Sequence, residues 1–360
     1  MPTLPFYLVE HFSVGTGMVG IIMSCYVVAA LLIRPFSGYL VDKYARKPLY
    51  ILSFVLFVAF TAGYLIAGSI LLFIILRFSH GITWGLITTA GNTLAIDIMP
   101  SAKRGEGLGY YGLALNLAMA IGPMAGLFLY EQYSYELIFY FAIIAGVIGL
   151  ISASFIKAPQ KAPVVHQPFT LDRFILTKSI PLGVNLLFLT LTYGMILSFA
   201  AMLGRERGMS HTGLFFTLMA VGMAISRIFS GKLIDRGQIR MVTIMGAIIL
   251  SSGFAVFTFT ESSFLYYFAS LIMGFGYGVL FPAFQALFIN MGTHHQRGTA
   301  NSTFFTAFDL GVGIGMIAAG KIAALFSLTF AFGISTAACV FALFLFMKII
   351  FPYYEKHKVL

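Results

Sequence analysis

The sequence predicts an all-α membrane protein made of two repeated halves, and two observations carry this prediction. Of the 360 residues, 59% are hydrophobic and 9% are charged, whereas a soluble domain is about one quarter charged. The chain also repeats itself at a constant offset, so that Arg34 returns as Arg227, 193 residues later. Such a composition fits a bilayer, and such a repeat indicates two homologous bundles.

The repeat is clearest in two stretches that end in charged residues. Residues 34–47 read Arg-Pro-Phe-Ser-Gly-Tyr-Leu-Val-Asp-Lys-Tyr-Ala-Arg-Lys, and residues 227–240 read Arg-Ile-Phe-Ser-Gly-Lys-Leu-Ile-Asp-Arg-Gly-Gln-Ile-Arg. At the same offset, without a gap, Gly20, Gly81, Gly85 and Gly122 match Gly213, Gly274, Gly278 and Gly315. The matches therefore run along the whole half, as expected of a duplicated unit.

Apolar runs give the predicted spans, since a helix needs about 20 residues to cross a bilayer. They lie at roughly 17–41, 48–67, 70–98, 106–130 and 136–156, and then at 179–203, 211–234, 241–260, 264–291, 299–325 and 328–351. This makes eleven spans, which is an odd total for a duplicated protein.

The repeat accounts for the odd number. Residues 1–10 align with residues 194–203, the second half of the span that starts near Ser179. We therefore expect a short helical stub at the start, with most of helix 1 missing from a fold of two pseudo-symmetric six-helix bundles. The predicted organisation is an N-terminal bundle at 1–156, a cytoplasmic linker at 157–178, a C-terminal bundle at 179–351 and a cytoplasmic tail at 352–360.

Lysine and arginine placement predicts the orientation in the membrane. Sixteen of these residues fall in one set of loops and tails, and only Arg205 and Arg207 fall in the other. Because cytoplasmic loops carry the excess of positive charge, the linker and the C-terminus are predicted to be cytoplasmic. The net charge of +10 is then mostly a topology signal and indicates no nucleic-acid partner.

Other classes of protein find no support in the sequence. Cys25 and Cys339 both lie in apolar runs, which favours packing over a disulfide or a metal site. The sequence has no nucleotide-binding loop and no cluster of metal ligands. The prediction is therefore a membrane protein without cofactor or metal that is not an enzyme.

The stretch around Asp42 forms a candidate latch motif, which consists of Gly38, Asp42, Arg46 and Lys47 with Asp97, and of Gly231, Asp235 and Arg240 in the second half. Gly38 allows a neighbouring helix to approach closely. Asp42 sits at the predicted membrane boundary, where a carboxylate can face the N-terminus of a helix. We expect Asp42 near the start of the span at 299–325, with Arg46 or Lys47 reaching Asp97. The alternative is a charged loop that only anchors two helix ends.

Arg77 lies deep in the span at 70–98, and the repeat places Ser270 at the matching site. A charge inside a span is costly and normally faces the protein interior or a water-filled cavity. The span at 106–130 holds Gly122, Pro123 and Gly126, which offer a smooth face and a possible kink. A structural role remains the alternative for both features.

These motifs together resemble the major facilitator superfamily, and within it the proton-driven drug antiporters. Gly38, Leu40, Asp42, Arg46 and Lys47 are similar to the family pattern Gly-x-Leu-x-Asp-x-x-x-Arg-Lys. Arg77 and Gly81 resemble Arg-x-x-x-Gly, and residues 118–127 resemble Gly-x-x-x-Gly-Pro-x-x-Gly-Gly. In the last pattern Ala118 and Leu127 replace two glycines.

The resemblance implies a substrate site between the halves near the middle of the membrane. The implied residues for the cavity and for proton coupling are Arg77, Trp84, Asn92, Tyr277, Phe281 and Gln285. It further implies a monomer in the cell membrane whose partners are the lipid bilayer, protons and a small-molecule substrate.

Four polar residues are predicted to pair across the interface between the halves. Arg34 lies ~12 Å from the cytoplasmic boundary and Asp309 ~15 Å from it, at 1.5 Å per residue. The family geometry places their spans side by side, which predicts an ion pair, and the repeat puts Arg227 opposite Asn116. The alternative is that each residue bonds only within its own half.

The predicted function is proton-coupled efflux of small molecules by alternating access. One alternative is an exporter of sugars, metabolites or metallophores, or an uptake symporter. Another, from a different class, is a membrane sensor or scaffold that does not transport.

Overall fold

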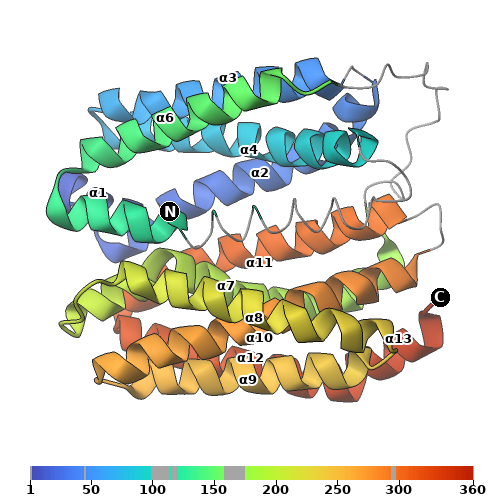
Figure 1. Ribbon diagram of the computed structural model, residues 1–360. Coiled ribbons are helices and arrows are strands. Elements are labelled where there is room, and N and C mark those ends of the chain that lie inside the picture. The colour runs from blue at the N-terminus through green and yellow to red at the C-terminus, as the bar shows by residue number, and fades with distance from the viewer. Residues whose placement is uncertain are drawn as a thin grey trace. The chain divides into compact units, whose positions relative to one another are not determined.

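The computed structural model describes residues 2–43, 46–98, 114, 118, 121–157, 175–292 and 297–359 (Figure 1). Within these ranges the chain is built from helices and contains no strand. The helices of the first part are α1 (Leu4–Phe12), α2 (Thr16–Lys43), α3 (Arg46–Gly63) with the 3₁₀ turn η1 (Tyr64–Ile66), α4 (Ile70–Ile98) and α6 (Tyr135–Ser154). Those of the second part are α7 (Ile180–Glu206), α8 (Gly213–Asp235), α9 (Ile239–Phe259), α10 (Ser263–Met291), α11 (Arg297–Leu325), α12 (Leu328–Leu345) and α13 (Phe351–His357).

These helices confirm the predicted spans. Among the described residues, ten helices are long and apolar enough to cross a membrane. The helix ends lie within three residues of the predicted limits, except at the C-terminus. The remaining predicted span, at 106–130, lies mostly outside the described residues, although residues 121–132 are helical. Helix α1, with nine residues, agrees with the expected short stub.

The last helix continues beyond the predicted span limit at residue 351 and ends at His357, inside the stretch 352–360, whose place as a cytoplasmic tail stays a prediction. A π-helical turn, η6 (Phe346–Ile350), leads directly from α12 into α13. Pro352, which has no backbone N–H, follows this turn directly in the first turn of α13, and prolines and π-helical turns commonly mark such a local irregularity in a long helix. Beyond the helix, the Val359 amide donates to the Asn290 carbonyl oxygen at 2.8 Å.

The packing groups the chain into two compact units. The N-terminal unit comprises Ile22–Leu115 and Leu129–Pro168, and the C-terminal unit comprises Met1–Ile21, Asn116–Phe128 and Phe169–Leu360. These units are defined by which residues pack together. The predicted bundles at 1–156 and 179–351 were inferred from the repeat instead, and they stay a prediction.

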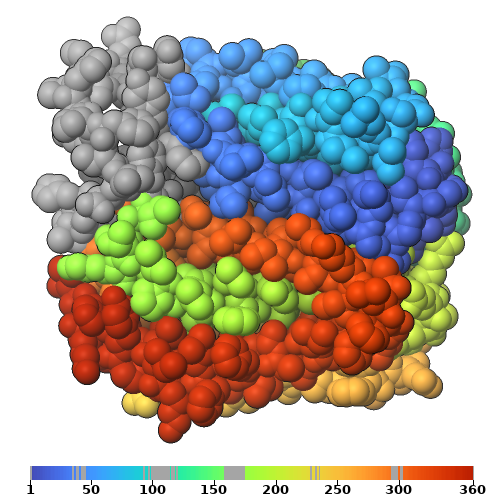
Figure 2. Space-filling model, turned by 180° about the vertical axis from the view of Figure 1, so that it is seen from behind, coloured from blue at the N-terminus to red at the C-terminus, as the bar shows by residue number. Residues whose placement is uncertain are grey.

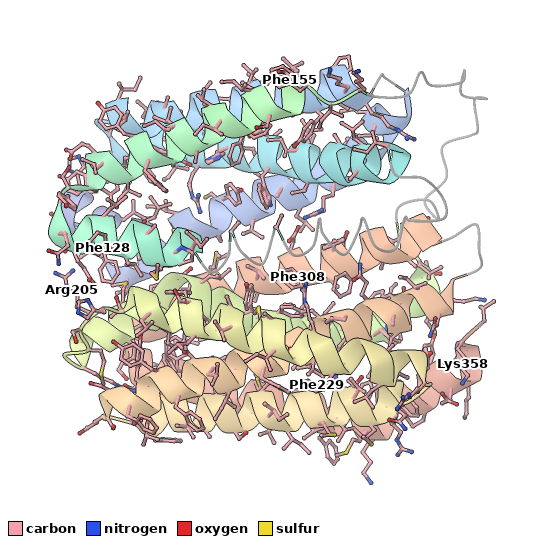
Figure 3. The ribbon with its side chains drawn as sticks, viewed as in Figure 1. Phe128, Phe155, Arg205, Phe229, Phe308 and Lys358 are labelled. Carbon is pink, nitrogen blue, oxygen red and sulfur yellow. The ribbon has the colours of Figure 1, made fainter. Side chains whose placement is uncertain are left out.

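In the C-terminal unit, α10 packs against α8 and α9, and α7 packs against α11 and α12. Figure 2 shows α7 (green) between α11 and α12 on one face. Large apolar side chains cover the outside, and Phe229 on α8 (Figure 3) is 58% exposed. An apolar exterior of this kind is stable only in contact with lipid.

Arg207, which follows α7, ties three helices of the C-terminal unit together. Its guanidinium donates hydrogen bonds to the carbonyl oxygens of Phe257, Thr258 and Thr260 at 2.7–2.8 Å, and to Thr329 Oγ1 at 3.0 Å. A cation at the C-terminal end of α9 satisfies carbonyls that lack a helical partner. Burial lowers the pKa of Arg207, although the group stays charged at neutral pH.

The repeat reappears in the helix contacts. A Cβ atom built on Gly81 of α4 would overlap the carbonyl oxygen of Tyr26 on α2. A Cβ atom built on Gly274 of α10 would overlap that of Met219 on α8. The two contacts match at the repeat offset: Gly274 lies 193 residues after Gly81, and Met219 lies 193 residues after Tyr26. The two helix pairs therefore cross at the same point, and the crossing requires glycine.

The crossing gives a stability prediction. We expect Gly274→Ala to lower the melting temperature of the purified protein, because overpacking a tight contact costs about 1–3 kcal/mol. Gly333→Ala on α12 is the matched control, since its Cβ would lie 3.9 Å from Thr258 Cγ2, an ordinary contact. Equal melting temperatures for the two variants would contradict the tight crossing.

Candidate functional site

Arg77 of α4 is buried inside the N-terminal unit. Its side chain is 2% exposed, and the guanidinium carbon lies 4.5 Å from the centre of the Tyr26 ring. Nη2 also lies 4.0 Å from the Met23 sulfur. The face of an aromatic ring attracts a cation and stabilises it most where water is absent. Arg77 therefore lies in the interior of the N-terminal unit, and its predicted place at a cavity with a role in coupling stays a prediction.

His80 lies one turn after Arg77 and belongs to the same buried group. Its Nδ1 lies 3.0 Å from the Tyr64 hydroxyl, and its Nε2 lies 3.5 Å from Thr61 Oγ1. Arg77 interacts electrostatically with both Tyr64 and His80. The N-terminal unit therefore holds a polar cluster, defined here as Thr61, Tyr64, Arg77 and His80, inside membrane-spanning helices.

Trp84 and Asn92 are the other predicted cavity residues of α4. Trp84 is half-buried, and its ring lies 6.2 Å from Tyr26 and 6.0 Å from Phe57. It therefore borders the polar cluster on the α2 and α3 side. The side chain of Asn92 lies outside the described ones.

The C-terminal unit contains an aromatic group that comprises Tyr193 of α7, Tyr277 and Phe281 of α10, and Phe308 of α11. The Phe281 ring centre lies 5.1 Å from Tyr277, 5.5 Å from Tyr193 and 4.9 Å from Phe308. Figure 3 shows Phe308 on α11. Such separations are those of favourable ring contacts. The structure thus places the predicted Tyr277 and Phe281 together.

The hydroxyls of the two tyrosines differ in their bonding. Thr192 Oγ1 donates to the Leu189 carbonyl oxygen at 2.7 Å, so it accepts the hydrogen bond of the Tyr277 hydroxyl at 2.6 Å. The Tyr193 hydroxyl is buried and has no hydrogen-bond partner in the described part of the chain. A buried unpaired hydroxyl costs about 1–3 kcal/mol, so the Tyr193 hydroxyl is a candidate donor to a ligand or a water molecule.

The aromatic group lies near a cation and is partly exposed. Arg227 of α8 interacts electrostatically with the Tyr193 hydroxyl. Phe281, Phe308 and the predicted Gln285, one turn further along α10, are all half-buried. The group can therefore offer ring faces, a hydroxyl donor and a nearby cation to a ligand.

Sequence reasoning did not select Tyr193, Phe308, Tyr64, Thr61 or His80 as site residues. The chain has 38 phenylalanines and 18 tyrosines, so residue type alone selects none of them. The repeat offset gives no further signal, because the matching positions of Tyr64, Thr61 and Phe308 hold Phe257, Phe254 and Leu115.

The latch motif is only partly described. Lys47 Nζ donates to the Ser154 carbonyl oxygen at 2.8 Å, a favourable contact for a cation at the C-terminal end of α6. The Arg240 guanidinium lies 5.1 Å from the Phe351 ring centre. Arg46 is half-buried, and nothing lies within 4 Å of a Cβ built on Gly231.

The structure does not test the predicted contacts of the remaining residues of the latch motif. Gly38 is part of α2, but its surroundings, like the side chains of Asp42, Asp97 and Asp235, lie outside the described set. The expected contacts of Asp42 with α11, and of Arg46 or Lys47 with Asp97, stay predictions.

The predicted interface pairs also stay predictions. Arg34 and Asp309 are both half-buried, and they belong to different compact units. Arg227 is exposed, while Asn116 lies outside the described residues.

Gly122, Pro123 and Gly126 lie within residues 121–130, the continuous part of the span at 106–130 that the structure describes. Nothing lies within 4 Å of a Cβ built on Gly122, and one built on Gly126 would lie 3.4 Å from Thr3 Cγ2. Pro123 is half-buried within the helical stretch 121–132. Across the described residues, no three His, Cys, Asp or Glu side chains gather as a metal site.

Three curated relatives resemble this chain. A transporter of the MFS type from Methanocaldococcus jannaschii, MJ1560, is 26% identical over 320 residues, which cover 85% of this chain and 82% of the relative. The staphylopine export protein of Staphylococcus aureus is 20% identical and covers 85% and 80%. The quinolone resistance protein NorA of Staphylococcus aureus is 27% identical over 163 residues, or 45% of this chain and 42% of NorA.

A solved structure shares the fold. The bacterial homologue of the human lysosomal transporter Spinster superimposes with a TM-score of 0.80 over 99% of this chain and 94% of its own, at 14% identity. The sequence model of the Major Facilitator Superfamily matches residues 1–303 and 182–359. With its spanning helices, its internal repeat and this match along its length, the chain belongs to the Major Facilitator Superfamily of multi-pass membrane transporters.

Proposed function

We propose that this transporter exports small molecules across the cell membrane by alternating access and couples export to protons moving inward. The observation that carries the proposal is the fully buried Arg77. A buried cation is expensive in a membrane, and the other half of the chain has Ser270 at the matching position. This asymmetry supports a role for Arg77 beyond folding, and proton coupling is the role that the family resemblance implies.

The relatives support the direction of transport. One is named for the export of staphylopine and another for resistance to quinolones, and the first of these names describes outward transport. The staphylopine relative aligns along most of both chains, which supports a metabolite or metallophore as an alternative cargo. An uptake symporter and a sensor that does not transport remain the competing functions.

In this proposal the two sites have separate tasks. The aromatic group of the C-terminal unit contacts the substrate, because its half-buried rings suit an apolar or aromatic molecule. Arg77 and its neighbours handle coupling in the N-terminal unit. The bundles at 1–156 and 179–351 move against each other as a monomer, and the latch motif and the Arg34–Asp309 pair hold one state. The excess of lysine and arginine places the linker and C-terminus in the cytoplasm.

The function is tested with everted membrane vesicles that contain the chain. We expect a fluorescent quinolone or a metallophore to accumulate when the vesicle interior is acidified, and a protonophore to abolish the accumulation. Vesicles without the protein are the control. Equal accumulation with and without the proton gradient would contradict coupling. Failure to move any compound of a broad panel would favour the sensor.

The substrate role of the aromatic group gives a second prediction. We expect Phe281→Ala to raise the KM for an aromatic substrate roughly 2- to 10-fold, since an aromatic contact contributes about 0.5–1.5 kcal/mol. Phe264→Ala is the control on the same helix, because Phe264 is 73% exposed and stands outside the aromatic group. A KM equal to wild type in Phe281→Ala would contradict this assignment.

A further inference from the structure

The polar cluster of the N-terminal unit contains hydrogen bonds whose directions can be derived. Thr61 Oγ1 donates its one proton to the Phe57 carbonyl oxygen at 2.8 Å. Thr61 must therefore accept at its 3.5 Å contact with His80 Nε2, which places a proton on Nε2. A neutral ring then has its lone pair on Nδ1, so the Tyr64 hydroxyl, 3.0 Å away, is the donor.

This bonding makes a chain that runs in one direction, from Tyr64 through His80 and Thr61 to a backbone carbonyl. A carbonyl oxygen accepts a hydrogen bond but does not take up the proton. The chain therefore ends there and cannot carry protons to or from Arg77. Its physical effect is to fix orientations.

The fixed orientation matters for Arg77. Because the Tyr64 proton is directed to His80, the Tyr64 oxygen is left with lone pairs, which favour the neighbouring guanidinium with which it interacts. Among the described residues, the rings of Tyr26, Phe57 and Tyr64 also face His80. A neutral His80 avoids placing a second buried cation beside Arg77.

The repeat supplies an internal comparison for Tyr64. Its ring contacts Phe73 at 5.0 Å and Phe139 at 5.6 Å. At the matching positions, Phe257 contacts Tyr266 at 5.5 Å and Phe332 at 4.9 Å. The ring environment is thus repeated, but the hydroxyl stands on Tyr64 in the first half and on Tyr266, at the position of Phe73, in the second.

The other three residues of the polar cluster also differ from the residues at their repeat positions. The positions that match Thr61, Arg77 and His80 hold Phe254, Ser270 and Met273, all of them buried. Phe254 and Met273 are apolar, and the Ser270 hydroxyl bonds to the Tyr267 carbonyl oxygen of its own helix. The scaffold packs well without this chain of hydrogen bonds.

We propose that Tyr64 and His80 are positioning residues of Arg77: His80, neutral with its proton on Nε2, accepts the hydrogen bond of the Tyr64 hydroxyl at Nδ1, and this leaves the lone pairs of the Tyr64 oxygen for the guanidinium. The purpose of positioning Arg77 rests on the proposed function, in which Arg77 takes part in proton coupling. The hydrogen-bond chain itself rests on geometry alone.

The first test is nitrogen NMR of histidine-labelled protein in lipid nanodiscs, which needs no transport. His80→Met, which installs the residue of the repeat position, identifies the His80 signals among the seven histidines. We expect a neutral ring protonated at Nε2, and we expect Tyr64→Phe to shift the Nδ1 signal because it removes the donor. A charged ring, a proton on Nδ1, or an unchanged signal in Tyr64→Phe would overturn the proposal.

The second test measures transport by Tyr64→Phe, which the fold accepts because Phe257 occupies the matching site. We expect the gradient-driven rate to fall about tenfold, as for a lost hydrogen bond to a charged group, with KM unchanged. The control is Tyr266→Phe, which deletes another buried hydroxyl, bonded to the Ala200 carbonyl oxygen at 3.1 Å, and should leave the rate unchanged.

The two tests separate two kinds of failure. A wild-type rate in Tyr64→Phe, or an equal loss in Tyr266→Phe, would overturn the positioning role although transport exists. If the wild-type protein does not transport, the proposed function fails, and the NMR result decides the hydrogen-bond chain alone.

Discussion

The close approach of α2 to α4 at Gly81 is the constraint on which the N-terminal unit depends. Without a Cβ atom at Gly81, the Tyr26 backbone lies against α4, and this places the Tyr26 ring 4.5 Å from the Arg77 guanidinium. Helices in a membrane gain little from the hydrophobic effect and rely on such close packing. The glycine that builds the crossing therefore also provides part of the surroundings that a buried cation needs.

The same crossing in the C-terminal unit, at Gly274, encloses different chemistry. There the positions around α10 are filled with apolar and aromatic side chains, and Tyr277 stands where α4 has Trp84. A duplicated scaffold thus separates two features: a charged, hydrogen-bonded cluster in one unit and an aromatic group with an unpaired Tyr193 hydroxyl in the other. This asymmetry within a symmetric backbone is what points to function, because packing alone would allow both halves to be filled alike.

Much of the fold could be predicted from the sequence, because spans follow from apolar runs and the repeat follows from matched glycines. The end of the last helix at His357 was missed, because the apolar run that marks the span stops at Phe351 and mostly polar or charged residues follow. Arg77 was found because a charge in an apolar run is conspicuous. Tyr64, Thr61 and Tyr193 were not, because their roles depend on which neighbour receives each hydroxyl proton, and that depends on helix packing. The interface pairs and the latch motif stay predictions.

The central claim is that Arg77 serves transport while the scaffold folds without it. The most direct measurement is gradient-driven transport by Arg77→Ser, which installs the residue found at the repeat position, in protein shown to be folded by its melting temperature. We expect a melting temperature close to wild type and loss of gradient-driven transport. Retained transport would contradict the role of Arg77 in coupling, and a protein that no longer folds would contradict its independence from folding.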